Sequence, residues 1–230
     1  MMKTAVITGI SKGIGKALCE LLLSKNYRVT GIGQHKPDIE NEHLTFIKAD
    51  VRNYIQVADA ILQIKTNYNN QIDVLINNAG LGYFGNLEDM PIEQWHEMFD
   101  TNVDGVFYTC KEIIPIMKQQ KSGHIINIAS TAALEGMPQV SAYCASKWAV
   151  KGLTESLWRE LRDYKIKVTC VYPGSTKTDF FRNSPGIKPH DYMLMPEDVA
   201  QMIVHAIETP PNFHQVNLEV RPLQPKGPKV

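Results

Sequence analysis

Short apolar runs alternate with longer amphipathic stretches along most of this chain. An apolar run rich in β-branched residues predicts a buried strand, and apolar positions spaced three and four apart predict a helix with one buried face. We therefore expect strands near residues 3–8, 27–32, 44–48, 72–76, 124–129, 166–172 and 215–221. Helices are expected near residues 14–25, 53–68, 91–120, 141–164 and 196–208, with room for a break in the third.

The alternation of strands and helices predicts an α/β fold, because a parallel crossover needs an element that returns over one face of the sheet. We expect a single doubly wound domain over residues 1–230, with a mostly parallel seven-stranded sheet and helices on both faces. Such sheets bind ligands beyond the carboxyl ends of their strands. Gly9, Asn77, Ser130 and Pro173 each follow a predicted strand, so they are expected at one site.

Tyr143 and Lys147 lie four residues apart in a predicted helix, so their side chains share one face. An ammonium beside a phenol favours the phenolate and lowers the pKa of the phenol. Ser130, on a separate segment, can hold a substrate oxygen beside that phenol. This set can move a proton on or off a carbonyl or alcohol oxygen. Taken alone, the spacing also fits a surface helix with a solvated lysine.

Gly9, Gly13 and Gly15 lie between the first predicted strand and the first predicted helix, in the sequence TGISKGIG. At such a turn the backbone N–H groups and the helix dipole face a pyrophosphate. The spacing G-x3-G-x-G differs from the common G-x-G-x-x-G fingerprint. A glycine-rich turn without a ligand is the alternative.

Five motifs occur in order: TGISKGIG at 8–15, NNAG at 77–80, Ser130, YCASK at 143–147, and Pro173-Gly174 after a strand. Together they resemble the short-chain dehydrogenase/reductase family over residues 3 to 221. The resemblance implies a Rossmann-type fold. It also implies an oxidoreductase that transfers a hydride between NAD(P)(H) and a small carbonyl or alcohol substrate.

The resemblance assigns catalytic roles to four residues. Tyr143 is similar to the family's general acid and base, and Lys147 to the lysine that lowers its pKa and binds the nicotinamide ribose. Ser130 resembles the serine that orients the substrate oxygen. Asn102 resembles the asparagine whose backbone carbonyl holds a water at a local helix break, although a solvated or capping asparagine is the alternative.

The resemblance also places the cofactor. Asp50 and Val51 match the pair at the adenine ring, and Asn77 to Gly80 match a segment that lines the adenosine and also ties the central strands together. Thr176 and Thr178 look like contacts to the nicotinamide amide and the phosphates. Asp50 equally fits a turn or cap, and the threonines equally fit an ordinary loop. The expected cofactor-binding residues are Gly9, Ser11, Lys12, Gly13, Ile14, Gly15, Asp50, Val51, Asn77, Ala79, Gly80, Tyr143, Lys147, Pro173, Gly174, Thr176 and Thr178.

The choice of cofactor depends on the end of the second predicted strand. An enzyme that uses NAD usually has a carboxylate there for the ribose 2′-OH, whereas this chain has Gly33 followed by Gln34. Lys12 stands where NADP(H)-using relatives often carry a basic residue, which can pair with the 2′-phosphate. The arginine common after that strand is replaced by Gln34. We therefore expect NADP(H) to be preferred and leave NAD(H) open.

Composition argues against several other classes of protein, namely those that bind nucleic acid, membranes or metals. The 230 residues are 43% apolar and have zero formal net charge, which gives one sizeable core and no basic block for nucleic acid or an anionic membrane. No apolar run approaches a membrane span. The seven histidines and four cysteines lack metal-site spacing, so we expect no metal, reduced thiols and a cytoplasmic location.

The substrate-facing segment is expected at about residues 177–195, which correspond to the family's mobile lid. Its apolar and aromatic residues favour a medium, mostly uncharged carbonyl compound over a polyanion, and they equally fit packing within the lid itself. The candidates for this lining are Phe180, Phe181, Tyr192, Met193 and Met195, with Tyr83, Leu134 and Met137 from elsewhere in the chain.

Three alternatives stay open at this stage. The chain could be an NAD-dependent alcohol dehydrogenase of the same family, a non-catalytic cofactor sensor on this fold, or an interaction subunit. The resemblance further implies a homodimer or homotetramer that assembles through the helices near 91–120 and 141–164 and through the last strand.

Overall fold

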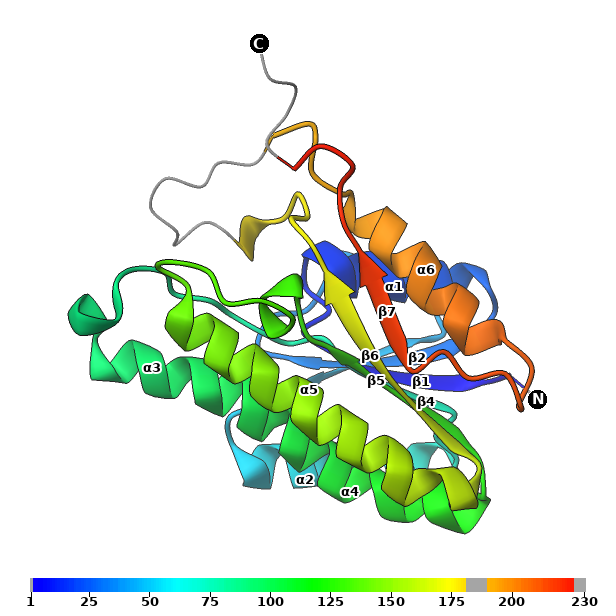
Figure 1. The fold of residues 1–230 in the computed structure, drawn as a ribbon. Coiled ribbons are helices and arrows are strands. Elements are labelled where there is room, and N and C mark those ends of the chain that lie inside the picture. Colours follow the sequence, from blue (N-terminus) through cyan, green and yellow to red (C-terminus); the bar gives the residue numbers. More distant parts are fainter. Residues whose placement is uncertain (1, 181–189, 226–230) are drawn as a thin grey trace.

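A seven-stranded sheet forms the centre of the computed structural model, which describes residues 2–180 and 190–225 (Figure 1). The strand order is β3-β2-β1-β4-β5-β6-β7, and every pairing between these strands is parallel. The strands are β1 (Thr4–Thr8), β2 (Arg28–Gly33), β3 (Leu44–Lys48), β4 (Val74–Asn77), β5 (Gly123–Ile128), β6 (Ile166–Pro173) and β7 (Asn217–Val220).

Of the six α-helices in the described residues, α1 and α6 cover one face of this sheet and α2, α4 and α5 cover the other (Figure 1). The predicted doubly wound α/β fold is therefore confirmed. The helices are α1 (Gly13–Ser24), α2 (Tyr54–Asn67), α3 (Ile92–Phe99), α4 (Gly105–Gln120), α5 (Ser141–Leu161) and α6 (Pro196–Glu208).

The predicted break in the helix near 91–120 is a π-helical turn, Asp100–Asp104, between α3 and α4. Element ends differ from the predictions by a few residues. The helix expected over 141–164 ends at Leu161 and continues as a 3-10 turn, Arg162–Tyr164. The strand expected over 215–221 is limited to Asn217–Val220, where it pairs with β6.

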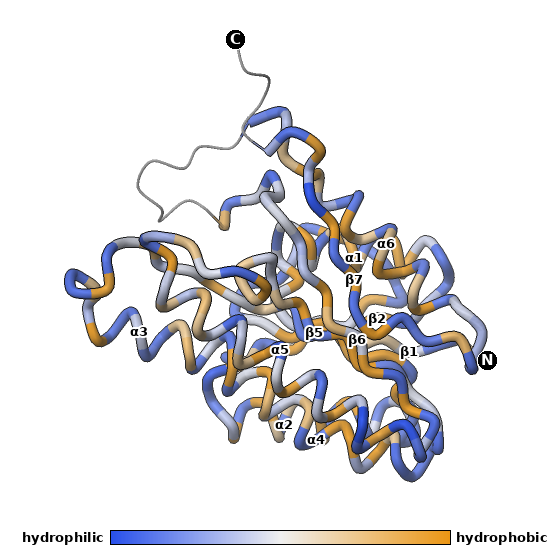
Figure 2. Tube along the Cα trace, viewed as in Figure 1, coloured by the Kyte–Doolittle hydropathy of each residue, from blue (hydrophilic) through white to orange (hydrophobic). Residues whose placement is uncertain are grey.

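Two apolar cores lie on the two faces of the sheet. Val6 packs with residues of α2, α4 and α5, whereas its neighbour Ile7 packs with residues of α1 and α6. Alternate side chains of a strand point to opposite faces, so both faces of a central strand must be apolar. Figure 2 shows the result, with hydrophobic residues concentrated along the strands and on the inner sides of the helices.

A buried polar network joins the sheet to α4 and α5. Asn77 of β4 donates a hydrogen bond from Nδ2 to Oδ1 of Asn127 on β5, at 2.8 Å, and accepts one from Thr109 of α4, at 2.6 Å. Asn127 in turn donates to Thr154 Oγ1 of α5, at 2.9 Å. Because these polar groups are fully partnered, their burial is tolerated and fixes how the helices sit on the sheet.

Candidate active site

Ser130, Tyr143 and Lys147 meet where β5 ends, as the sequence predicts. Lys147 and Tyr143 occupy adjacent turns of α5, and the Lys147 ammonium lies 5.7 Å from the centroid of the Tyr143 ring. Lys147 Nζ donates to the carbonyl of Ile128, the last residue of β5, at 2.9 Å. Ser130 follows two residues later, and its side chain hydrogen-bonds to the Tyr143 phenol.

Burial raises the pKa of Tyr143 above its ordinary value, and the hydrogen bond with Ser130 only partly offsets this. The direction is opposite to the lowering expected from sequence. The physical reason is that the phenol is withdrawn from water, which disfavours its anion, while the Lys147 ammonium is engaged with a backbone carbonyl. A phenol that stays neutral is a proton donor.

Lys147 is also buried, with 4% of its surface exposed. Burial lowers the pKa of its ammonium to about 8, because a low-dielectric environment disfavours the charged form. Lys147 therefore changes charge close to physiological pH.

Asn102 lies in the π-helical turn and is buried. Its side chain accepts from the Leu81 N–H at 3.0 Å and donates to the Leu81 carbonyl at 2.9 Å and to Ser146 Oγ at 3.0 Å. It thus fastens the loop after β4 to α5. Gly80 lies beside the same groups, since a Cβ there would lie 3.2 Å from Asn102 Oδ1 and 3.5 Å from Lys147 Nζ.

The glycine turn after β1 is closed by the loop after β4. Asn78 donates from Nδ2 to the carbonyls of Thr8 and Gly9, at 3.1 and 2.9 Å, and Thr8 Oγ1 accepts from the N–H groups of Asn78 and Ala79. Gly9 has φ +72°, and a Cβ on Gly15 would overlap the Gly9 carbonyl and the Asn78 amide. Only glycine fits this turn, which leads directly into the N-terminus of α1.

Asp50 and Val51, expected at the adenine, follow β3. Asp50 forms an ion pair with Arg52 at 2.6 Å, and this hydrogen-bonded pairing lowers the pKa of the Asp50 carboxyl. Arg52 also binds Glu97 of α3 at 2.9 Å. Val51 is buried against Gly105. Arg52 and Glu97 were not predicted from the sequence, in which only the position of Arg52 two residues after Asp50 points to the pair with that carboxylate.

The other expected cofactor residues divide into two groups. Ser11, Gly13 and Ile14 are partly exposed around the glycine turn, and Gly80 is exposed beside Lys147. Asn77 directs its amide into the buried network, so only its backbone can face a ligand.

On the far side of the site, Pro173 ends β6, and the Gly174 N–H donates to the Val220 carbonyl at 2.8 Å. Thr176 is buried and donates from Oγ1 to the Gly174 carbonyl at 2.9 Å. Thr178 lies against Gly13, because its Cγ2 would be 3.1 Å from a Cβ added there. The structure therefore brings this segment to the glycine turn.

An aromatic cluster of Phe84, Tyr143 and Phe180 covers the phenol. The centroids of Phe84 and Phe180 lie 5.6 and 5.5 Å from that of Tyr143, and 6.2 Å from each other. Phe180 was expected in the substrate lining, whereas Phe84 was missed, although it lies only four residues after the NNAG motif. Phe181 lies outside the described residues.

The remaining expected lining residues lie in varied surroundings. Tyr83 donates from its hydroxyl to Glu97 at 2.7 Å, and Leu134 packs at the edge of the core under α5. Met193 is buried. Met137, Tyr192 and Met195 are exposed.

Lys12 extends from the glycine turn toward the segment after β6. Its Nζ lies 3.6 Å from the carboxylate of Asp179, and both side chains are largely exposed. At the end of β2, Gly33 is followed by exposed Gln34, whose side chain hydrogen-bonds to Asp50. The structure thus has no acid at Gly33 or Gln34.

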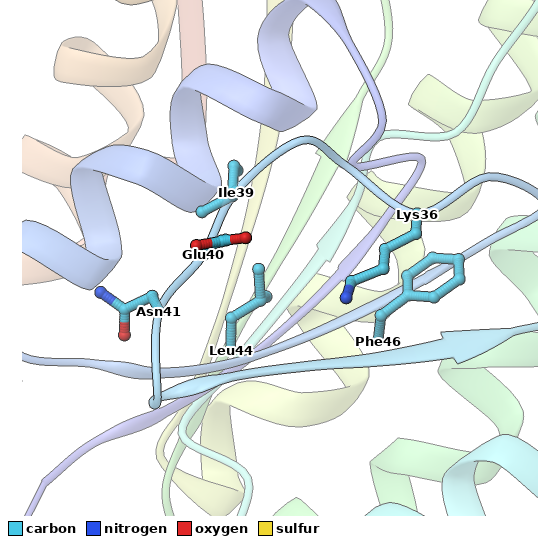
Figure 3. A pocket seen from close by; sticks show the side chains of 6 residues that line it. All are labelled: Lys36, Ile39, Glu40, Asn41, Leu44 and Phe46. Atoms are coloured by element: carbon cyan, nitrogen blue, oxygen red, sulfur yellow. The ribbon is translucent and has the colours of Figure 1, made fainter.

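A shallow pocket beside the edge strand β3 is separate from these residues (Figure 3). Ile39 and Glu40 from the preceding loop line it together with Leu44 and Phe46 of β3. Lys36 and Asn41 complete its lining. In the part of the chain that the structure describes, no three potential metal ligands gather, and no helix is long and apolar enough to cross a membrane.

Comparisons with known proteins agree with this geometry. A family model described as short chain dehydrogenase matches residues 3–186. An uncharacterised oxidoreductase of Staphylococcus aureus is 31% identical over 229 residues, which cover 96% of this chain and 97% of the relative.

Two solved structures are similar over nearly the whole chain. ElxO with NADP bound has a TM-score of 0.87 at 28% identity, covering 95% of this chain and 97% of that one. An alcohol dehydrogenase from Thermococcus sibiricus complexed with 5-hydroxy-NADP has a TM-score of 0.88 at 26% identity and covers 100% of both chains. Together with the matched family model, these likenesses confirm the resemblance drawn from the motifs: the chain belongs to the short-chain dehydrogenase family and is an NAD(P)-dependent oxidoreductase.

Proposed function

We propose that this protein transfers a hydride between NADP(H) and a carbonyl or alcohol substrate, with Tyr143 as the general acid and base. The observation that carries the proposal is the buried Tyr143 phenol, held between the side chains of Ser130 and Lys147 at the end of β5. A neutral phenol can donate its proton to a carbonyl oxygen that becomes an alkoxide, and in oxidation the phenolate form can take the proton back from the alcohol.

Each residue of the set has a separate task in this proposal. Ser130 holds the substrate oxygen within reach of the phenol. Lys147 stabilises the phenolate that remains after proton donation, because its ammonium lies beside the ring. Asn102 fixes the loop after β4 against α5, so that Gly80 and Lys147 keep their spacing. Phe84 keeps water away from the phenol, because its ring lies against that of Tyr143.

The glycine turn fits a dinucleotide. Its close packing at Gly9 and Gly15 leaves the N-terminus of α1 open to a pyrophosphate, and a Cβ at either position would fill the turn. When bound, the nicotinamide supplies or accepts the hydride. Tyr143 and Lys147 would face its ribose, while Thr176 and Thr178 would lie at the amide and the phosphates.

A preference for NADP(H) over NAD(H) rests on charge. The end of β2 carries Gly33 and Gln34 rather than a carboxylate, and the exposed Lys12 is a cation within the glycine turn. A dianionic 2′-phosphate is attracted by such a cation and would be repelled by an acid. The bound NADP described for ElxO supports the same preference.

Tyr143→Phe tests the catalytic assignment. The variant lacks only the phenolic hydroxyl, so we expect turnover with NADPH and a set of apolar aldehydes and ketones to fall by roughly 100-fold or more. NADPH affinity, measured by nicotinamide fluorescence, should stay unchanged. Tyr164→Phe, at an exposed tyrosine after α5, is the matched control and should keep full turnover. Turnover of Tyr143→Phe within tenfold of the unmodified protein would contradict the assignment, and tighter binding of NADH than NADPH would favour the NAD-dependent alternative.

We also propose a cytoplasmic location and a homodimer or homotetramer. The four cysteines are buried and unpaired, as expected for a reducing compartment. Phe107 of α4 and Trp148 of α5 are exposed on the two helices through which assembly is expected.

A further inference from the structure

One short turn after β6 contacts both halves of the candidate site. Thr178 packs on Gly13 of the glycine turn, and the Phe180 N–H donates to Thr178 Oγ1 at 3.3 Å. Phe180 then lies on Tyr143, with ring centroids 5.5 Å apart. Residues 178–180 therefore join the turn that would hold the cofactor phosphates to the phenol that would serve the substrate.

Asp179, at the middle of this turn, faces Lys12 of the glycine turn. The carboxylate and the ammonium lie 3.6 Å apart, with 67% and 61% of the two side chains exposed. An exposed pair of this kind is weak, because water and salt screen both charges. A phosphate that carries two charges is a stronger partner for the same ammonium.

We propose that Asp179 competes with the 2′-phosphate of NADP(H) for Lys12 and so limits the affinity of the protein for the phosphorylated cofactor. This inference rests on the proposed function, which assigns the 2′-phosphate to Lys12. The carboxylate acts in two ways. It holds the ammonium in a pair that the phosphate must break, and it adds a negative charge close to the place that the phosphate takes.

The competition for Lys12 also affects the contact between Phe180 and Tyr143. Once Lys12 leaves Asp179, residues 178–180 lose an ion pair that ties them to the glycine turn, and they keep their packing on Gly13 and the contacts of Phe180. The 2′-phosphate therefore loosens Phe180 from Tyr143. NADH lacks this phosphate and leaves the pair intact.

The first experiment compares Asp179→Asn with a matched control. Asp191→Asn removes a carboxylate from the ion pair with Lys177, formed at 2.8 Å close to the same turn, and leaves Lys12 untouched. We expect Asp179→Asn to tighten NADPH binding roughly fivefold, as measured by nicotinamide fluorescence, and to leave NADH binding unchanged. Asp191→Asn should change neither. In a Lys12→Ala background, Asp179→Asn should improve NADPH affinity by less than twofold.

The outcomes separate the inference from the proposed function. If the unmodified protein prefers NADPH but Asp179→Asn behaves like Asp191→Asn, the inference is wrong and the cofactor assignment stands. An equal gain for NADPH and NADH also overturns the inference. If the unmodified protein binds NADPH no better than NADH, the cofactor preference fails, and the inference fails with it.

The variant Phe180→Trp tests whether the 2′-phosphate loosens residue 180 from Tyr143, and the measurement needs no turnover. Phe180→Trp places an indole against Tyr143, and adenosine 2′,5′-bisphosphate should shift its emission to longer wavelength, while AMP should not. The unmodified protein, with Trp95, Trp148 and Trp158, gives the background. The same emission with the bisphosphate and with AMP would show that Phe180 does not respond to Lys12, and would refute the coupling.

Discussion

Replacing His124 by glutamine tests how a buried imidazole limits the stability of this fold in acid. His124 lies at the start of β5 with 5% of its surface exposed. Its Nε2 lies 2.8 Å from Thr169 Oγ1, and that hydroxyl donates its own hydrogen to the Gln215 carbonyl at 2.7 Å. The imidazole must therefore donate from Nε2, and its Nδ1 has no hydrogen-bond partner among the described residues.

Burial lowers the pKa of His124 from 6.5 to about 3, and the neighbouring His214 and Lys167 act in the same direction. In the folded protein the ring thus stays neutral, whereas in the unfolded chain it takes up a proton near its ordinary pKa. Stability from this residue is present above pH 6.5 and is lost as the pH falls below it. Between pH 7 and pH 4.5 the linkage amounts to about 2.5 kcal/mol in the free energy of unfolding.

Urea unfolding at pH 7 and pH 4.5 measures this loss. Glutamine at position 124 keeps an N–H donor for Thr169 but does not titrate, so the variant should lose about 2.5 kcal/mol less than the unmodified protein over this interval. His205→Gln, at an exposed histidine on α6, is the control and should behave like the unmodified protein. The comparison remains valid if glutamine lowers stability at both pH values, because only the difference is used. An equal loss in both proteins would refute the assignment of this acid sensitivity to His124.

Three further predictions concern the site and its surroundings. Gly15→Ala should abolish tight NADPH binding and lower the melting temperature, because its Cβ would overlap the Gly9 carbonyl. Gly152→Ala, on the open face of α5, is the control and should raise the free energy of unfolding by about 0.5–1 kcal/mol. Equal melting temperatures for the two variants would contradict the packing argument. The rate of carbonyl reduction at saturating NADPH should fall as the pH rises through about 8, the pKa to which burial lowers Lys147, and a rate that stays flat from pH 7 to pH 9.5 would exclude this role. Light scattering at micromolar concentration should give the mass of a dimer or tetramer, and a monomer mass would contradict the proposed assembly.

The fold was predictable because its central strands are covered on both sides. All five residues of β1 are buried, and its centre, Ala5-Val6-Ile7, is the uninterrupted apolar run expected of a strand with two covered faces. The break near Asn102 was also predictable from helix propensity, since asparagine is unfavourable inside a helix. The ends of elements were less predictable. Gln215 continues the pattern of β7, but its carbonyl accepts from Thr169 before the strand begins.

The site was predictable where the reactive residues belong to one helix, because their spacing in the sequence then fixes their relative position. Tyr143 and Lys147 share a helix, so their spacing alone puts them on one face. The contacts of Phe84, Arg52 and Asp179 depend on loops that meet only in the folded chain. The direction of the Tyr143 pKa shift was mispredicted for a related reason: sequence reveals the nearby ammonium, but it does not reveal how completely the phenol is removed from water.

Asn77 illustrates how a motif residue can serve the site without facing a ligand. Its amide holds Asn127, which holds Thr154 of α5, and Thr154 lies seven residues after Lys147 on the same face of that helix. The network therefore fixes the position of α5 along β5. A slip by one turn would move the Lys147 ammonium roughly 5 Å from the Ile128 carbonyl, and the Tyr143 phenol equally far from Ser130. Because every member of the network is buried and partnered, such a slip would leave several polar groups unpaired. The interior of the sheet thus fixes the geometry in which the proposed proton transfer takes place.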